Sequence, residues 1–388
     1  MWLSDLRIVQ HDRVIERGAV RIDNGMIAEI REEPVAGGIA GDGLALMPGF
    51  IDMHGDMIER ELEPRPRVNM PAEIAFRELD RRLAGAGVVT AYAAVSFTTG
   101  AAAGEMRSFE HTGQVIRDLC AVRDKLNVDH RIHARFDITL ENALSVIRGL
   151  IEDDALDLVS LMDHTPGQGQ YRDIERHIEH VAHMRGISRT EAQALVERKI
   201  ADRTRPEDVL TATLREISDL CKAHKVIMAS HDDDTVEKVA LMNAFGVAIS
   251  EFPVDMIAAK EAHACGLANA MGAPNALRGQ SYSGNLSARQ AHEAGVLDIL
   301  ASDYHPSSIL PAILILAQTD PNGLPGAVRL ATANPAKALG LIDRGRIEVG
   351  QKADLVIAET DGMGHIVTSM RNGRVIYSDG VVGLNKAA

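Results

Sequence analysis

The hydrophobic pattern along the chain has two distinct styles. Residues 3–34 and 345–380 contain short runs in which apolar and polar positions alternate, separated by glycine and other turn residues. This alternation is typical of strands with one buried face and one exposed face. We therefore expect the two chain ends, residues 1–44 and 343–388, to combine into one small β-sandwich domain.

Between these ends, continuous apolar runs alternate with longer stretches of helical periodicity. Strands that are apolar on both faces belong to sheets covered by helices, so the pattern predicts a parallel sheet in an α/β fold. Eight such units within residues 45–342 favour a closed, TIM-like (β/α)8 barrel. The expected strands lie at residues 45–54, 87–97, 131–138, 156–164, 225–233, 247–253, 267–274 and 297–304.

One connection in the expected barrel is unusually long. Residues 165–205 follow the fourth strand, and Ser188 with Glu191 forms a capping-box pattern that starts a helix. We expect this excursion to cover the barrel mouth as a lid. Its opening segment, GQGQYR at 167–172, places Gln170 where it can contact a bound substrate.

Histidine and acidic residues recur where the expected strands end, and that edge carries the chemistry of a (β/α)8 barrel. His54 and Asp56 project together, because alternate residues of a strand share a face. Asp137 and Asp233 also fit as helix caps. Imidazole and carboxylate groups bind divalent metals, so the pattern favours a site for one or two ions. The strand-end residues are His54, Asp56, Asp137, Asp163, His164, His231, Asp232, Asp233, Glu251 and Asp303.

A hydrolytic role for such a site follows from the acidity of bound water. A divalent ion lowers the pKa of its coordinated water from 15.7 to about 7. Asp303 ends the last strand, where a carboxylate can both ligate the ion and accept the proton of the water. Of the adjacent Asp163 and His164, we expect His164 to face the metal with Asp163 behind it. Zinc is the first expectation for the ion, with manganese or iron as alternatives.

Composition and charge make some classes of binding partner unfavourable. The net charge of −14 disfavours nucleic acid, and no apolar run approaches the length of a membrane span. The N-terminus lacks the apolar core of a signal peptide, and the cysteines Cys120, Cys221 and Cys265 are far apart, so we expect a cytoplasmic protein. Its partner is expected to be a small phosphorylated molecule, while assembly into a homo-oligomer remains open.

Two loops beyond the strand ends suit a phosphate-rich substrate. Prolines stiffen the segment 63–67, and its two arginines carry guanidinium groups, which bind phosphate bidentately. The segment 278–285 follows the seventh strand, where barrels frequently bind phosphate, and its glycines permit close backbone approach. A solvated basic loop and an ordinary structural loop remain the alternatives. The candidate contacts are Arg65, Arg67, Arg278, Ser281, Ser283 and Asn285.

These motifs resemble a known family. The strand-end residues, TANPAKALGL at 332–341 and GRIEVGQKADLVI at 345–357 are similar to the amidohydrolase superfamily. HGDMIERELEPRPRV at 54–68, SLMDHTPGQGQY at 160–171 and MGAPNALRGQSYSGN at 271–285 resemble its branch of diphosphatases in phosphonate breakdown. The resemblance implies hydrolysis of alpha-D-ribose 1-methylphosphonate 5-triphosphate to the 5-phosphate and pyrophosphate. The metal ligands that it implies are His54, Asp56, His164, His231 and Asp303, with Asp137 as a further carboxylate.

The chain departs from the wider superfamily at two places. The usual HxH of the first strand is His54-Gly55-Asp56 here, and the fourth strand, LDLVSLMDH, lacks the lysine that becomes a bridging carbamate. Asp137 and Glu251 are then the candidates for a bridging ligand. A hydrolase acting on an amide, cyclic amide or amidine carbon is the main alternative, and a non-catalytic scaffold in a multi-protein assembly is the second.

Overall fold

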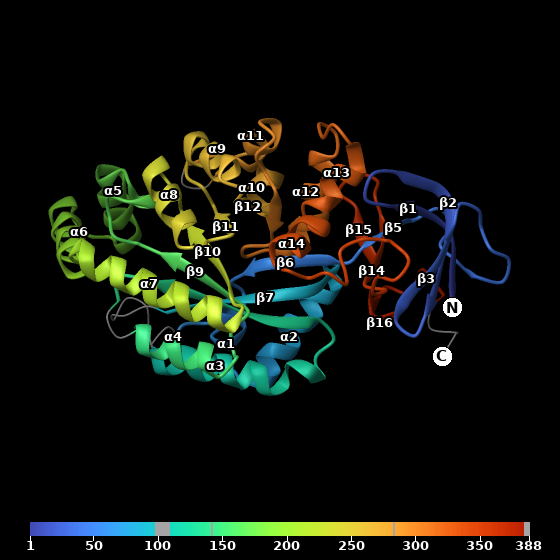
Figure 1. The fold of residues 1–388 in the computed structure, drawn as a ribbon, viewed down its shortest axis with the longest axis horizontal. Helices are drawn as coiled ribbons and strands as arrows, with labels where there is room; N and C mark the ends of the chain where they lie inside the picture. Colours follow the sequence, from blue (N-terminus) through green and yellow to red (C-terminus); the bar gives the residue numbers. More distant parts are fainter. Residues whose placement is uncertain (98–108, 141–142, 282–283, 384–388) are drawn as a thin grey trace.

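The strands of the chain form two separate sheets that lie side by side. We describe a computed structural model, which covers residues 1–97, 109–140, 143–281 and 284–383. The barrel occupies most of the molecule, and the sheet built from the two chain ends lies at one side of it (Figure 1). Within the described residues, no helix is long and apolar enough to cross a membrane.

The larger sheet is the expected (β/α)8 barrel. Its eight parallel strands follow each other in chain order, from β6 to β13. Backbone contacts close the ring, since the Asp303 amide donates to the His54 carbonyl at 2.9 Å and the Asp56 amide donates to the Asp303 carbonyl at 2.8 Å. The strands are β6 (Phe50–Gly55), β7 (Val88–Ser96), β8 (Asp129–Asp137), β9 (Leu158–Met162), β10 (Ile227–His231), β11 (Ile249–Glu251), β12 (Ala268–Gly272) and β13 (Ile299–Ala301).

The barrel interior is packed with apolar side chains, which leaves only its mouth for polar chemistry. Ile51, Met53, Tyr92, Leu158 and Ile249 belong to one buried cluster inside the ring of strands. A much larger cluster lies between the outer faces of the strands and the surrounding helices. Apolar side chains fill this inner part of the barrel, and the histidines and carboxylates meet at the strand ends above it.

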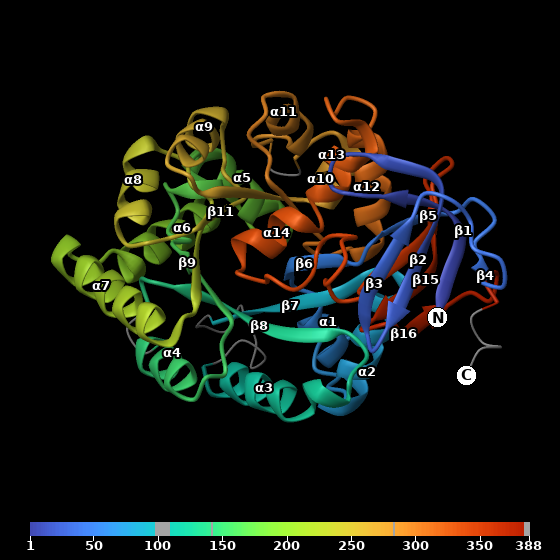
Figure 2. The same ribbon diagram turned by 45° about the vertical axis from the view of Figure 1, so that its right-hand side comes forward.

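The connections between the strands are largely helical, and Figure 2 shows the helices around the barrel. The helix α2, for example, buries Phe76, Leu79 and Leu83 at helical spacing. The helices are α1 (Ile58–Leu62), α2 (Ala72–Gly85), α3 (Phe109–Val122), α4 (Ala143–Glu152), α5 (Ile174–Arg185), α6 (Arg189–Arg203), α7 (Glu207–His224), α8 (Val236–Ala244), α9 (Met256–Ala264), α10 (Ala273–Arg278), α11 (Ala288–Glu293), α12 (Ile309–Leu316), α13 (Gly323–Arg329) and α14 (Ala333–Ala338).

The second sheet confirms that both chain ends build one small β domain. Its strands are joined in one mixed sheet, in the order β16–β15–β14–β5–β1–β2–β3 with β4 paired to β1. Leu6, Val20 and Leu355 belong to its own buried cluster. The strands are β1 (Trp2–Val9), β2 (Val14–Asp23), β3 (Met26–Arg31), β4 (Ile39–Ala40), β5 (Ala45–Pro48), β14 (Leu355–Glu359), β15 (His365–Arg371) and β16 (Arg374–Ser378).

The run expected as one strand at 45–54 is divided between the two sheets. Its first half, β5, pairs with β1 and β14 of the small domain, whereas β6 begins the barrel at Phe50. The chain changes sheet at Gly49, where a Cβ atom would lie 2.4 Å from a methyl carbon of Val89. A glycine is therefore required for the close approach of the backbone at this junction.

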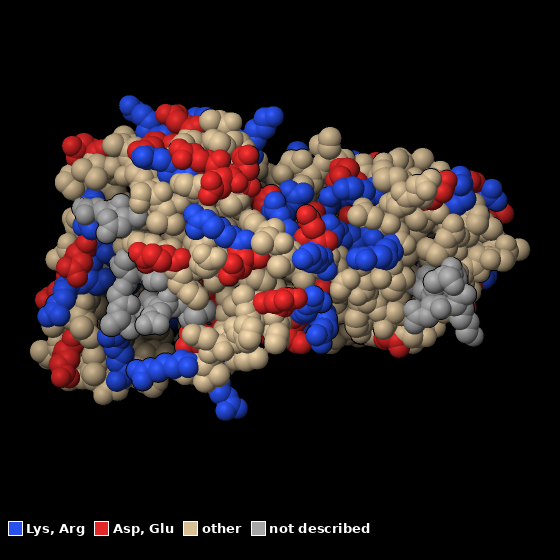
Figure 3. Space-filling model, turned by 90° about the horizontal axis from the view of Figure 1, so that it is seen from below, with Lys and Arg blue, Asp and Glu red and all other residues tan. Residues whose placement is uncertain are grey.

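The long connection after β9 folds into a helical hairpin of its own. The helices α5 and α6 enclose a small cluster of Ile178, Ala192 and Val196, and the capping box at Ser188 and Glu191 is present. In Figure 1 the hairpin lies at the end of the molecule opposite the small sheet. Acidic and basic side chains are interspersed over the face drawn in Figure 3, so the net charge of −14 is not concentrated there.

Candidate metal centre and substrate pocket

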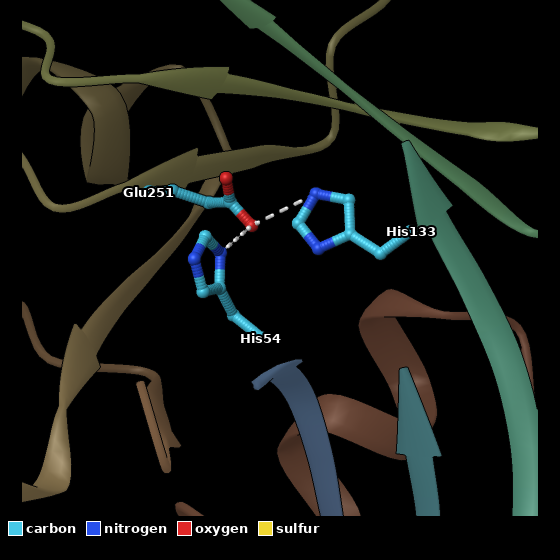
Figure 4. A group of neighbouring side chains, drawn as sticks. All are labelled: His54, His133 and Glu251. Carbon is cyan, nitrogen blue, oxygen red and sulfur yellow. Dashed lines mark hydrogen bonds and ion pairs between the residues drawn. The ribbon is translucent and has the colours of Figure 1, made fainter. Parts of the chain in front are cut away.

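One group of candidate metal-binding side chains is fully buried at the barrel mouth, and it is drawn in Figure 4. His54 comes from β6, His133 from β8 and Glu251 from β11, and all three are buried. One Glu251 oxygen lies 3.1 Å from His54 Nδ1 and 3.6 Å from His133 Nε2. Ser160 Oγ lies 2.5 Å from His133 Nε2 and donates to the other Glu251 oxygen at 2.5 Å. The Glu251 carboxylate is therefore held from three sides.

Burial keeps both imidazoles of this group neutral. It lowers the pKa of His54 well below its usual value and lowers the pKa of His133 to about 3. A neutral imidazole has one N–H and one lone pair, so a His54 ring that donates from Nδ1 to Glu251 presents the lone pair of Nε2. This is how a carboxylate commonly orients a metal-binding histidine.

A second group lies beside the first, at the ends of β9 and β10. It consists of His164, His231 and Asp232, and His231 Nδ1 lies 3.2 Å from an Asp232 oxygen. The His231 ring centre is 5.7 Å from that of His164 and 5.9 Å from that of His54, so the two groups are neighbours. Burial lowers the pKa of His164 to about 3, and its Nε2 has no hydrogen-bond partner within the described residues.

Carboxylates complete the centre, and their charges interact. Burial and the nearby Asp56 raise the pKa of Asp303 to about 7. Burial also raises the pKa of Asp232, but His231 outweighs this effect and holds the value at about 2. The donor set of neutral imidazoles and carboxylates, with His164 Nε2 among the buried imidazole nitrogens that lack a hydrogen-bond partner within the described residues, fits a divalent cation.

The backbone around the centre is strained. Asp232, Phe252 and Asp303 have φ values of 53°, 54° and 56°, although none of them is a glycine. Such conformations cost about 1–3 kcal/mol each and persist where the surroundings impose them, which is common at functional sites. They lie at the ends of β10, β11 and β13, next to the candidate ligands.

A cavity of 360 Å³ opens above these side chains. Its floor includes His54, Arg135, His231 and Asp303, while the excursion after β9 contributes Gln170. The segment after α10 forms another part of the wall. Further lining residues are Arg278, Gln280, Ser281, Asn285 and Tyr304. Side chains from four barrel strands (β6, β8, β10 and β12), from α10 and from the loops beyond the strand ends thus surround a space that suits a small polar molecule.

Many of the residues expected from the sequence meet at this cavity, and others lie elsewhere. Asp137 joins neither metal-binding group, because its carboxylate pairs with Arg203 of α6 and accepts from Thr139. Arg65 and Arg67 are exposed and are not among the lining residues. The expected contact Ser283 lies outside the described residues.

Sequence reasoning missed two side chains of the centre, His133 and Arg135. Both lie on β8, within RIHARFD, and only the terminal Asp137 of that segment was considered. Residues 133, 135 and 137 share one face of a strand, so the alternation itself carried the signal. Glu251 was one of the two candidates for a bridging ligand, and the structure shows it hydrogen-bonded to His54.

The fold and the strand-end histidines define a (β/α)8-barrel protein with a candidate metal centre at its mouth. The chain belongs to the amidohydrolase family, whose sequence profile matches residues 77–378. It is 34% identical over 383 residues to alpha-D-ribose 1-methylphosphonate 5-triphosphate diphosphatase of Escherichia coli (strain K12), covering 97% of this chain and 100% of that protein.

Solved structures confirm the fold. The N-acetylglucosamine-6-phosphate deacetylase of Thermotoga maritima has a TM-score of 0.62 at 16% identity, covering 97% of this chain and 100% of the other. A 5-methylcytosine deaminase of Klebsiella pneumoniae, liganded with 5-fluorocytosine, has a TM-score of 0.63 at 16% identity, covering 98% of both chains. At this level of identity the likeness concerns the fold alone.

Proposed function

We propose that this chain cleaves the triphosphate of alpha-D-ribose 1-methylphosphonate 5-triphosphate, giving the 5-phosphate and pyrophosphate. The observation that carries this proposal is the 34% identity, over nearly the whole of both chains, to a diphosphatase of that name. The cavity supports it, because cationic and hydrogen-bonding side chains line the space above the candidate metal ligands.

His54, Asp56, His164, His231 and Asp303 would hold one or two divalent ions, with zinc as our first expectation. A divalent ion at this position supplies Lewis acidity and lowers the pKa of a coordinated water. The group of His54, His133 and Glu251 favours a single ion. The Ser160 hydroxyl donates its hydrogen to Glu251, so its contact with His133 Nε2 requires the neutral tautomer of His133 that carries its hydrogen on Nε2. That nitrogen then has no lone pair to offer.

We assign the proton transfer to Asp303. Its carboxylate lines the cavity and lies close enough to Asp56 for the two charges to interact. A carboxylate here can accept a proton from the attacking water and deliver it to the leaving oxygen. Arg278, Ser281 and Asn285 would bind the phosphates farther from the centre, where guanidinium and hydroxyl groups stabilise the charge of departing pyrophosphate.

The excursion at 165–205 would act as a lid over this site. Gln170 lines the cavity, and the connection is held to the barrel by Arg172, whose guanidinium lies 2.6 Å from Asp255. The Gly169 amide adds a hydrogen bond of 2.7 Å to Asp234. A lid in this position excludes water from the reacting phosphates.

The direct test follows the products of the purified protein by phosphorus NMR. The proposal predicts equimolar 5-phosphate and pyrophosphate, with no orthophosphate from the same step. A parallel assay for ammonia or amine release from amides, cyclic amides and amidines tests the alternative that the centre attacks carbon. Turnover of those compounds without pyrophosphate release would replace the proposed function by that alternative.

A further inference from the structure

We propose that Arg135 binds the phosphoryl group at the reacting centre, next to the candidate metal ligands. The inference rests on the proposed function, because it requires a substrate with a chain of phosphates. It adds a residue from the third barrel strand, whereas the expected phosphate contacts all come from loops beyond the strand ends.

The position of the Arg135 side chain is the first step. It projects from β8 into the cavity, and only 13% of it is exposed. Its Nη2 lies 3.4 Å from His231 Nε2, and its Nη1 lies 3.8 Å from an Asp56 oxygen. Its Nε is buried and has no hydrogen-bond acceptor within the described residues. The guanidinium group therefore lies among the candidate ligands with donors to spare.

Two other arginines of this chain that are mostly shielded from solvent form close ion pairs. Arg344 donates to Asp129 at 2.7 Å and to Asp343 at 2.9 Å. Arg203 is as little exposed as Arg135 and pairs directly with Asp137. Burying a guanidinium is costly unless its charge is paired and its donors are used. Arg135 has no carboxylate this close within the described residues, since Asp56 is 3.8 Å away, and an anion entering the cavity would provide a close negatively charged partner.

The chemistry of the missing partner points to phosphate. A guanidinium presents five donors in a planar fork, which matches two oxygens of one phosphoryl group. Arg278 is exposed and lines the same cavity from the end of α10. Arg135, by contrast, lies at the floor beside His231. The two cations would therefore hold different phosphates of one chain, with Arg135 on the phosphoryl group that is attacked.

The charge balance of the floor adds a reason. Asp56 and Asp303 are neighbours, because the Asp56 amide donates to the Asp303 carbonyl at 2.8 Å, and negative charge on such carboxylates repels an entering triphosphate. The positive charge of Arg135 lies beside these carboxylates, since its Nη1 is 3.8 Å from an Asp56 oxygen and Asp303 lines the same floor. It offsets the carboxylates at the place where the phosphates must approach them.

The attacked phosphoryl group stays on the sugar when pyrophosphate departs, so the test measures the binding of ribose 5-phosphate by calorimetry, together with the metal content of each variant. We expect Arg135→Gln to weaken binding by about 10- to 100-fold, the loss of one charged hydrogen-bonding partner. Arg135→Lys keeps the charge without the fork, so it should bind with intermediate affinity. The lysine variant also serves if the glutamine variant does not fold.

Arg131→Gln is the matched control. Arg131 lies on the same strand at the opposite end of the barrel, where Asp129 and Asp157 hold it. We expect this variant to unfold at a lower temperature and to bind ribose 5-phosphate as the wild type does.

Each outcome decides the matter. Wild-type affinity in Arg135→Gln, or weaker binding that follows loss of metal, would overturn the role of Arg135 and leave the proposed function standing. A wild-type protein that releases no pyrophosphate from the triphosphate would remove the proposed function, and this inference with it.

Discussion

The ion pair between Arg203 and Asp137 offers a sharp test of how the barrel mouth is closed. Asp137 was expected among the metal ligands, whereas the structure pairs it with the last residue of α6. The Asp137 side chain is 2% exposed and that of Arg203 is 13% exposed. The two assignments make opposite predictions for the variants Arg203→Met and Asp137→Asn.

The expected magnitude follows from burial. Removing one partner of a buried ion pair costs about 3–5 kcal/mol, because the other charge stays buried without compensation. The hairpin of α5 and α6 has only a small buried cluster of its own, including Ile178, Ala192 and Val196. It can therefore relieve the cost by undocking, which lets water reach Asp137. A cost of about 3 kcal/mol shifts the docking equilibrium by more than about 100-fold.

Hydrogen exchange followed by mass spectrometry measures this shift. In Arg203→Met we expect amides of α6 to exchange about 100-fold faster, while the barrel strands keep their protection. Asp137→Asn keeps the hydrogen bonds with Thr139 and removes the charge, so it should have the same effect with full metal content. The double variant should fall well short of the sum of the two, because both changes remove one interaction.

Arg189→Met provides the control. Arg189 pairs with Glu175 across the same hairpin, but these side chains are 60% and 69% exposed. Exposed pairs contribute about 0–1 kcal/mol, so exchange in α6 should change little. If Asp137→Asn loses its metal while Arg203→Met leaves exchange in α6 unchanged, Asp137 is a ligand and the docking argument is wrong.

Three further predictions concern the centre and its support. Asp303→Asn should lower kcat for pyrophosphate release by about 10²- to 10⁴-fold while metal analysis finds the ion retained; activity near that of the wild type would exclude proton transfer by Asp303. Glu251→Gln should weaken metal binding by about 10- to 100-fold in a chelator competition, because His54 loses the carboxylate that orients it. Burial raises the pKa of Asp80, but hydrogen bonds from His130 and neighbouring backbone amides outweigh this and lower it. Because the pKa is lowered in the folded state, the carboxylate stabilises the fold at pH values above its unfolded pKa of about 3.9. In urea titrations, Asp80→Asn should therefore have a lower free energy of unfolding than the wild type at neutral pH, and this difference should shrink as the pH falls below about 3.9.

The fold was predictable because its signal is repeated along the chain. Eight apolar runs separated by helices leave few arrangements, and the alternating patterns at both ends mark a different kind of sheet. The division at Gly49 escaped prediction, because the apolar residues on both sides of it continue one pattern. Only the packing against Val89 shows why a glycine is needed at this junction.

The centre was predictable where a side chain follows directly from the end of a strand, as His54, His231 and Asp303 do. The role of Asp137 depends on Arg203, which is 66 residues away in a connection whose path has no periodic signal. Nothing local to Asp137 distinguishes a ligand from an ion-pair partner, because both need the same buried carboxylate at the same strand end.

The side chains of the centre that the sequence did not predict depend on the register between strands. Ser160 lies opposite Arg135 on one side and Ala229 on the other, and Glu251 lies opposite His231. This stagger is what brings His133, Ser160 and Glu251 together, although they belong to three different strands. Alternation along one strand says which side chains point inward, but it does not say which level of the barrel they reach. The sequence therefore indicates that His133 and Arg135 share one face of β8. Only the closed barrel shows that His133 lies beside His54 and Glu251, whereas Arg135 lines the cavity floor.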